Sequence, residues 1–291
     1  MSLNKPIYKF KNFINENKDK IVYKNLSLNP NAITYLKDNE DLIDWSYLSQ
    51  NTNNEVIDLF LSNNQDKINW FYVVQNPNLY ELLKFMPEDN MKYYYDIISS
   101  NSNAISIIEK NYDSISWDKL CLNESSYAIS LLMKNQYRIN WSLLSLNSNT
   151  DAVKFLLDNP KKINWLNFSL NKNPIAISYL DKNRNKIEWD YLSSNPSAIS
   201  ILLNNPDKIN WINASYNPFI FELTNDLDKI DWFNLSQNPA IFELDYEAMK
   251  NNEIHMKLEE ELIKEMMKPS RVFKNYNNQE EYDYLEELFG Y

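Results

Sequence analysis

The residue types that most often carry catalysis or bind metals are scarce in this chain. Its 291 residues contain one cysteine, Cys121, one histidine, His255, and one glycine, Gly290. Zinc sites need clustered Cys and His, and a nucleophilic triad needs a histidine base, so two such residues far apart in the sequence suit neither. Dinucleotide-binding and phosphate-binding loops need several glycines, so a chain with one glycine can form neither. No pair of carboxylates stands out for glycoside hydrolysis. The sequence therefore predicts no enzyme, catalytic residue, metal or cofactor.

Composition narrows the class further. The chain is 44% hydrophobic and 14% aromatic, which is too rich for disorder. Its 40 acidic and 29 basic residues give a net charge of −11, which repels a phosphate backbone unless the cations gather on one face. No apolar run is long enough to span a membrane. We expect a soluble protein with no membrane partner and no disulfide, and direct nucleic-acid binding is disfavoured.

An internal repeat organises the sequence. Ten units share an aromatic residue followed six positions later by asparagine, and eight of the aromatics are Trp. The aromatics are Tyr23, Trp45, Trp70, Tyr95, Trp117, Trp141, Trp165, Trp189, Trp211 and Trp232, and the asparagines are Asn29, Asn51, Asn76, Asn101, Asn123, Asn147, Asn171, Asn195, Asn217 and Asn238. Ile lies two residues before the aromatic in nine units, and an apolar residue lies three after it in all ten.

These neighbours predict a short helix that begins at the aromatic. Asp, Asn or Ser precedes the aromatic in seven units and would act as the N-cap. The Ile and the later apolar residue then occupy the N′ and N4 positions, which a hydrophobic staple brings together. We expect the Trp side chains to pack in the core. The alternative, a row of platforms on which nucleic-acid bases stack, is disfavoured by the adjoining staple.

A second helix is predicted after the asparagine column. In five units Asn is followed by Pro, which fits N-cap and N1. Four units carry two extra residues, so the cap moves to Asn53, Ser125, Asn149 or Asn173, yet the column asparagine stays in place. We hypothesise that these asparagines form a ladder in which each side-chain amide bonds the backbone turn of the adjacent unit.

The second helix ends on asparagine in seven units. These residues are Asn39, Asn63, Asn111, Asn135, Asn159, Asn183 and Asn205. Helices commonly place glycine there in the left-handed conformation, so we predict that asparagine substitutes for it. The single glycine and the 46 asparagines would then express one architectural fact.

The predicted fold class is all-α. We expect an α-solenoid of about ten helical hairpins, each of 21–25 residues, forming a curved rod of roughly 80–100 Å with a helical C-terminal cap. The expected domains are an N-terminal cap over 1–19, the solenoid over 20–249, and a cap with a partner-binding tail over 250–291. Cys121 lies in a column that is Ser in eight units, which predicts a small buried residue, and His255 is expected on the surface of a charged helix.

The clearest unit, Lys186-Ile187-Glu188-Trp189 to Asn195-Pro196-Ser197-Ala198-Ile199, resembles the Trp-containing short helical repeats of giant DNA viruses of protists, the mimivirus-like group. The resemblance covers about residues 20–245. The segment around Lys268-Pro269 is similar to one that often follows such arrays, where His-Pro is usual. The resemblance implies an interaction scaffold without assigned activity, located in the host cytoplasm or viral factory, or in the virion.

A cationic stripe is the first candidate binding site. Eight units carry Lys or Arg three residues before the aromatic, and stacking would align them: Lys20, Lys67, Lys92, Arg138, Lys162, Lys186, Lys208 and Lys229. Such a stripe suits phosphates or an acidic peptide. Neighbouring carboxylates such as Asp66 and Asp207 favour a neutralised, solvated edge instead.

The C-terminal segment is the second candidate site. Residues 280–291 are acidic and aromatic, and such a segment either folds onto the array or docks as an amphipathic helix in a partner's groove. The candidate partner-binding residues are Tyr282, Tyr284, Leu285, Leu288 and Phe289. Their pattern faintly resembles the helix that binds the cap-binding translation initiation factor, with a spacing one residue longer.

Three functions remain open from the sequence. The leading one is a non-enzymatic protein–protein interaction scaffold, viral or host proteins being its partners. Its selectivity would come from residues next to the aromatic, such as Ser46, Phe71, Leu166 and Ile212, and from the C-terminal segment. The alternatives are an adaptor in viral gene expression or translation initiation that docks through this segment, and RNA binding along the cationic stripe.

Overall fold

The computed structural model describes residues 6–61 and 64–251, and these are mostly helical with almost no sheet, so the all-α prediction is confirmed. The chain divides into two compact units. The larger is Phe10–Glu243, and the described residues of the smaller are 6–9 and 244–251. Strands β1 (Tyr8–Phe10) and β2 (Phe242–Leu244) form a two-stranded sheet.

Each repeat contains three short helical segments where the sequence predicted two. In nine units a 3-10 turn ends three residues before the aromatic, the position of the cationic stripe, and in the fourth unit it is Lys92–Tyr94; the first helix then begins at the aromatic. The first helices are α3 (Trp45–Leu48), α5 (Trp70–Val73), α7 (Tyr95–Ile98), α9 (Trp117–Leu120), α11 (Trp141–Leu144), α13 (Trp165–Ser169), α15 (Trp189–Leu192), α17 (Trp211–Ala214) and α19 (Trp232–Leu235). In the first unit this segment is a 3-10 helix, Tyr23–Leu28.

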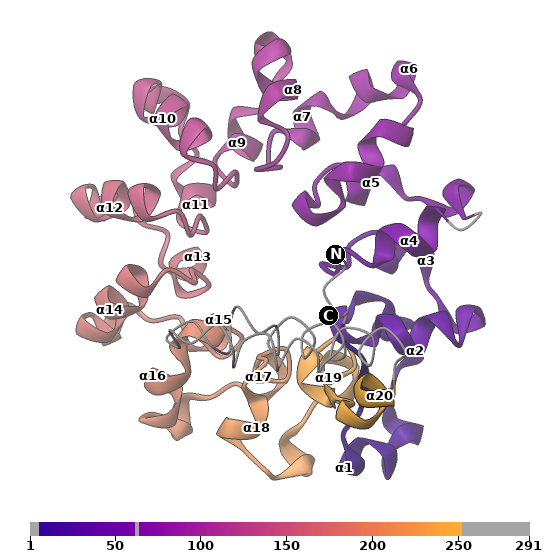
Figure 1. Ribbon diagram of the computed structural model, residues 1–291. Coiled ribbons are helices and arrows are strands. Elements are labelled where there is room, and N and C mark those ends of the chain that lie inside the picture. Colours follow the sequence, from indigo (N-terminus) through magenta and orange to yellow (C-terminus); the bar gives the residue numbers. More distant parts are fainter. Residues whose placement is uncertain (1–5, 62–63, 252–291) are drawn as a thin grey trace, which may run out of the picture. The chain divides into compact units, whose positions relative to one another are not determined.

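The second helices follow the asparagine column. They are α2 (Ile33–Lys37), α4 (Val56–Leu61), α8 (Ile105–Lys110), α10 (Ser126–Lys134), α12 (Thr150–Asp158), α14 (Pro174–Lys182), α16 (Ile199–Leu203) and α18 (Ile220–Leu223). The third unit has a 3-10 helix, Pro77–Phe85, in this place, and the tenth has the 3-10 turn Pro239–Ile241 before β2. The remaining helices are α1 (Asn12–Asn15), α6 (Glu88–Met91) and α20 (Tyr246–Asn251). Figure 1 shows α11, α13 and α15 on the inner side of the array and α12, α14 and α16 on its outer side.

Six of the seven predicted N-caps are present. Asn164, the residue before Trp165, accepts a hydrogen bond from the N–H of Asn167, and five of the other six predicted caps act in the same way. The exception is Asn69, whose side chain bonds Ser46 Oγ. The apolar residue three positions after the aromatic is buried in all ten units. Each first helix, although only about one turn long, is therefore anchored at both ends.

The asparagine ladder is confirmed in all ten units. In a typical rung, Nδ2 of Asn147 donates to the carbonyls of Cys121 and Asn123 in the preceding unit, at 2.9 and 3.0 Å. Its Oδ1 accepts from the N–H of Asn149 in its own turn, at 2.9 Å. These buried amides thus satisfy donors and acceptors that such short helices leave unpaired.

A second ladder, made of serine side chains, accompanies the asparagine ladder and was not predicted from the sequence. Ser145 Oγ donates to the carbonyl of Trp141 at 2.8 Å and accepts from the N–H of Asn164 in the next unit at 3.0 Å. Seven other units use serine at this position as an acceptor in the same way. The first turn of each of these helices is thereby bonded to the entry of the following repeat.

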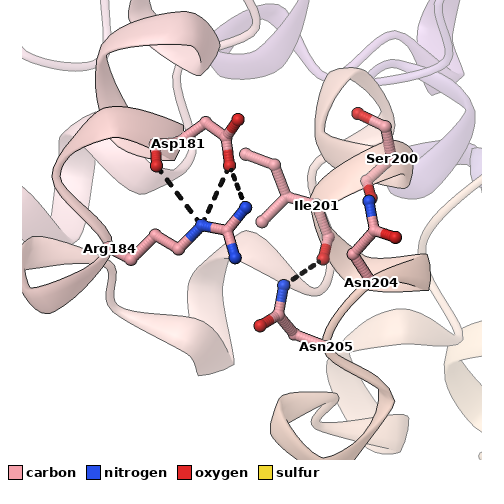
Figure 2. A network of polar contacts seen from close by, with 6 residues as sticks. All are labelled: Asp181, Arg184, Ser200, Ile201, Asn204 and Asn205. Atoms are coloured by element: carbon pink, nitrogen blue, oxygen red, sulfur yellow. Dashed lines mark hydrogen bonds and ion pairs between the residues drawn. The ribbon is translucent and has the colours of Figure 1, made fainter.

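The left-handed asparagines predicted at the ends of the second helices are wrong. Asn159, Asn183 and Asn205 have negative φ angles of −125°, −125° and −140°, which any residue can adopt. Their side chains cap the helix instead: Nδ2 of Asn205 donates to the carbonyl of Ile201 at 2.7 Å (Figure 2). Asn39, Asn111, Asn135, Asn159 and Asn183 do the same. Asn63 lies outside the described residues. Asparagine is used here for its amide, which glycine lacks.

The predicted curved rod is also wrong, because the first repeat bonds to the last. Nδ2 of Asn29 donates to the carbonyl of Asn238 at 2.7 Å, and the N–H of Val22 donates to Ser236 Oγ at 3.0 Å. Both are ordinary rungs of the two ladders. The ten repeats within Phe10–Glu243 therefore form a closed array, in which repeats one and ten are neighbours (Figure 1).

The N-terminal segment adds to this closure. The ring of Phe10 lies 4.4 Å from that of Phe242 in the last unit and 5.1 Å from that of Tyr35 in the first. The N–H of Lys11 donates to the carbonyl of Ile241 at 3.0 Å. In the smaller unit, Asp245 pairs with Lys9 at 3.7 Å and caps the start of α20 by accepting from the N–H of Ala248.

We expect Asn147→Ala to destabilise the protein by about 3 kcal/mol, lowering the melting temperature by roughly 6–10 °C, because three buried hydrogen bonds are lost. Asn204→Ala is the matched control, since this exposed asparagine bonds only the carbonyl of Ser200 in its own helix. Thermal unfolding followed by circular dichroism measures both. Equal melting temperatures for the two variants would rule out an energetic role for the ladder.

Candidate functional site

The tryptophan column is only half buried. All eight Trp side chains have intermediate exposure, so the prediction that they belong to the core holds for part of each indole only. In three units the indole packs on an aromatic ring of the second helix: Trp45 lies 5.7 Å from Phe60, Trp141 stacks on Phe155 with centroids 5.4 Å apart, and Trp165 stacks on Tyr179 at 6.2 Å. The rest of each ring is available to a neighbouring unit.

The cationic stripe occupies that available face. In six units the Lys or Arg lies over the Trp of the preceding unit, within the range of a cation–π interaction. The pairs and distances to the ring centroid are Lys67 on Trp45, 4.3 Å; Arg138 on Trp117, 4.6 Å; Lys162 on Trp141, 5.8 Å; Lys186 on Trp165, 5.7 Å; Lys229 on Trp211, 5.0 Å; and Lys20 on Trp232, 5.1 Å. The last pair joins the first repeat to the tenth.

Two members of the stripe have other partners. Lys92 lies over the ring of Tyr93 at 5.2 Å, and Lys208 pairs with Asp207 at 3.2 Å. The predicted neutralisation of Lys208 by Asp207 is thus confirmed. Lys229 is neutralised by a different acid, Asp226, at 3.9 Å. The side chains of the stripe remain exposed, so nucleic-acid binding along it stays a prediction. Their positions give them a structural use between repeats, which the sequence analysis did not identify.

Recognition side chains were expected next to the aromatic, and the structure leaves several of them exposed. We call the residue one position after the aromatic in each unit the variable column. Ser46 is exposed, and Phe71, Leu166 and Ile212 are exposed by 48%, 37% and 59%. Phe233, exposed by 47%, belongs to the same column and was missed, although its place in the repeat identifies it.

Two surface hollows adjoin the repeats. One, of about 370 Å³, is lined by Phe71, Tyr72, Gln50 and Gln75, and so lies beside the variable column. The other, of about 560 Å³, lies between α10 and α12, where Lys134, Lys154, Asp151 and Asp158 surround apolar residues. The mixed charges of the second hollow select no single kind of ligand.

Reactive groups are few in the described part of the chain. Cys121 is buried, as predicted, and its thiol contacts the carbonyl of Trp117 at 3.3 Å. Burial raises its pKa from 9.0 to about 11, although the N–H of Asn140 bonds the sulfur and opposes the shift. Among residues 6–61 and 64–251 there is no cluster of three His, Cys, Asp or Glu suited to a metal. In the same residues no helix has the length and apolar content to cross a membrane.

The second predicted site cannot be placed. Tyr282, Tyr284, Leu285, Leu288 and Phe289 lie outside the described residues, as does His255. Docking through this segment therefore stays a prediction. Comparison with known proteins adds no identification: no family model, curated protein or solved structure matches the chain.

We expect Lys67 and Trp45 to be energetically coupled by about 0.5–1 kcal/mol. The test is a double-mutant cycle with Lys67→Met and Trp45→Leu, measured by urea unfolding. The control cycle pairs Lys67→Met with Trp211→Leu in a distant repeat, and those two effects should add. Equal coupling in the two cycles would show that the stacking contributes nothing.

The raised pKa of Cys121 predicts a pH dependence of stability. The unfolded thiol ionises near pH 9 and the folded thiol near pH 11, so stability is full below pH 9 and is lost as pH rises through 11. Cys121→Ser removes this contribution, and should be tolerated because eight units carry Ser at this position. Urea unfolding at pH 8 and pH 10.5 should therefore show a larger loss in the wild-type protein than in the variant. An equal loss in both would contradict the assignment.

Proposed function

We propose that this chain is a non-enzymatic protein–protein interaction scaffold, built as an α-solenoid whose variable column selects the partner. The observation that carries the proposal is that each repeat has positions that bond or pack against neighbouring units and one exposed position that varies. The asparagine column, the serine column and the stapled apolar residues are committed to bonds and packing between units. The residue after the aromatic differs from one repeat to the next, and its side chain is exposed in nine of the ten units; Ser46 and Asp190 also accept a hydrogen bond from an asparagine of the next unit.

The contents of the variable column support recognition of a protein. In chain order it reads Lys24, Ser46, Phe71, Asp96, Asp118, Ser142, Leu166, Asp190, Ile212 and Phe233. It therefore mixes exposed apolar side chains with both signs of charge. Exposed aromatic and aliphatic residues among polar ones are typical of interfaces with proteins.

Other features weigh against the alternatives. The net charge of −11 opposes a phosphate backbone, and six cations of the stripe are already stacked on indoles. The one thiol is buried with a raised pKa, unlike the exposed thiolate of a reactive cysteine. On its repeat motif, we assign the chain to the giant-virus repeat proteins and place its partners in the host cytoplasm or viral factory.

The test is a variant with Phe71, Leu166, Ile212 and Phe233 all changed to Ser, compared with the wild-type protein. Tagged forms are purified from cells that express the protein naturally, and co-purifying proteins are quantified by mass spectrometry. We expect the variant to lose specific partners by at least tenfold while its melting temperature stays within about 3 °C, because the replaced side chains are exposed.

The matched control changes four exposed apolar residues outside the variable column to Ser: Leu61, Tyr137, Ile175 and Leu203. This control should retain the partners. Equal loss in both variants would reject the variable column as the binding surface, and partners absent from the wild-type protein would reject the scaffold.

A further inference from the structure

Four members of the variable column form a continuous row. Side-chain amides of the following units hold their backbone carbonyls: Asn213 bonds Asp190 at 2.9 Å, Asn234 bonds Ile212 at 3.0 Å, and Asn25 bonds Phe233 at 3.0 Å. We call Asp190, Ile212, Phe233 and Lys24 the recognition row. They come from repeats eight, nine, ten and one, so the last step crosses the junction between the ends of the array.

The row presents an ordered set of chemical groups. Its order is acid, apolar, apolar, base, and all four side chains are exposed. Asp190 Oδ1 accepts from Nδ2 of Asn210 at 3.0 Å, which orients the carboxylate and leaves its other oxygen for a partner. The two apolar side chains are exposed by 59% and 47% and lie between the opposite charges.

Resting on the scaffold function, we propose that the recognition row binds an extended peptide segment of a partner protein, with Lys or Arg opposite Asp190, apolar residues opposite Ile212 and Phe233, and Asp or Glu opposite Lys24. Adjacent packed helices lie about 8–10 Å apart, and in an extended chain of the polyproline II type every third residue lies on the same face, about 9 Å further along. The complementary sequence is therefore a basic, two apolar and an acidic residue at intervals of three. The experiment described below determines in which direction the peptide runs along the recognition row.

Charge complementarity selects this partner over others. A nucleic acid would place phosphates beside Asp190, and a membrane surface would have to accept charges at both ends of a two-residue apolar stretch. A peptide supplies opposite charges at both ends and apolar groups between them. The long-range charge of the protein adds to the attraction for the basic end.

The row exists only in the closed array. Phe233 and Lys24 are over 200 positions apart in sequence and become neighbours through bonds between repeats ten and one, including Asn31 Nδ2 to the carbonyl of Pro239 at 3.2 Å. Binding across this junction is thus coupled to closure: a peptide that contacts both repeats stabilises the closed form.

A phage-displayed library of random 12-residue peptides, selected on the full chain, tests the proposal. Peptides that also bind the Ile212→Ser/Phe233→Ser variant are removed. We expect enrichment of basic, apolar, apolar and acidic residues spaced by three, in one chain direction. On Asp190→Lys, the enriched basic position should change to Asp or Glu. On the control Asp118→Lys, which alters the same column outside the row, it should stay basic.

Affinity measurement gives the second arm. Fluorescence polarisation of the top synthetic peptide should show at least tenfold weaker binding to Asp190→Lys, restored when the peptide's basic residue becomes Glu, and no change for Asp118→Lys. Enrichment of another spacing, or a peptide indifferent to Asp190→Lys, would overturn the proposal. If peptides fail while the fourfold variable-column variant still loses its cellular partners, the scaffold stands and the extended-peptide mode is wrong.

Discussion

The structure depends on one repeated interaction, the buried asparagine amide that joins each unit to the one before it. Helices of four to nine residues leave a large share of their backbone groups without partners inside the helix. An amide side chain carries two N–H donors and a carbonyl oxygen, so one residue can bond the preceding turn and fix its own. Because this network is buried and its hydrogen bonds recur in every unit, a change in one rung leaves unpaired groups in two repeats at once. The ladder also explains why the asparagine persists where two residues are inserted after it.

Closure follows from the same interaction. Every repeat presents acceptors on one side and amide donors on the other, so an open array would end in unpaired groups at both ends, which repeat proteins ordinarily cover with special terminal units. Here no repeat follows the tenth, and the first repeat supplies the donor in its place: Nδ2 of Asn29 donates to the carbonyl of Asn238. The junction is less complete than the interior: Asn25 Oδ1, at this junction, is a buried side-chain atom without a hydrogen-bond partner, and among the described residues it stands alone in this.

Function is carried by what these interactions leave over. The tryptophan and the cation of the following repeat are paired with each other, and the asparagine and serine columns are saturated with backbone bonds. The position next to the aromatic remains: its carbonyl can be bonded by the next unit while its side chain stays exposed, as at Asp190 and Ile212. A rigid backbone with a variable side chain at regular spacing lowers the entropic cost of ordering a binding surface. This gives the repeat a physical reason to keep most columns constant and vary one.

Local periodicity in the sequence predicts the ten units, the start of each first helix, the moved caps and, from Asn147 and its equivalents, the asparagine ladder. The prediction of left-handed asparagines at the ends of the second helices is wrong. Composition does not distinguish an asparagine used for its backbone freedom from one used for its amide, as at Asn205. The repeat pattern identified the cations of the stripe without their indole partners, and it identified neither Phe233 nor its neighbour Lys24 as a binding residue. Those pairs depend on the rotation and rise from one repeat to the next, summed over ten repeats, and no single unit carries that sum. Only the tertiary structure could decide that the array closes, since closure is a property of the accumulated geometry and the sequence pattern is the same for an open array.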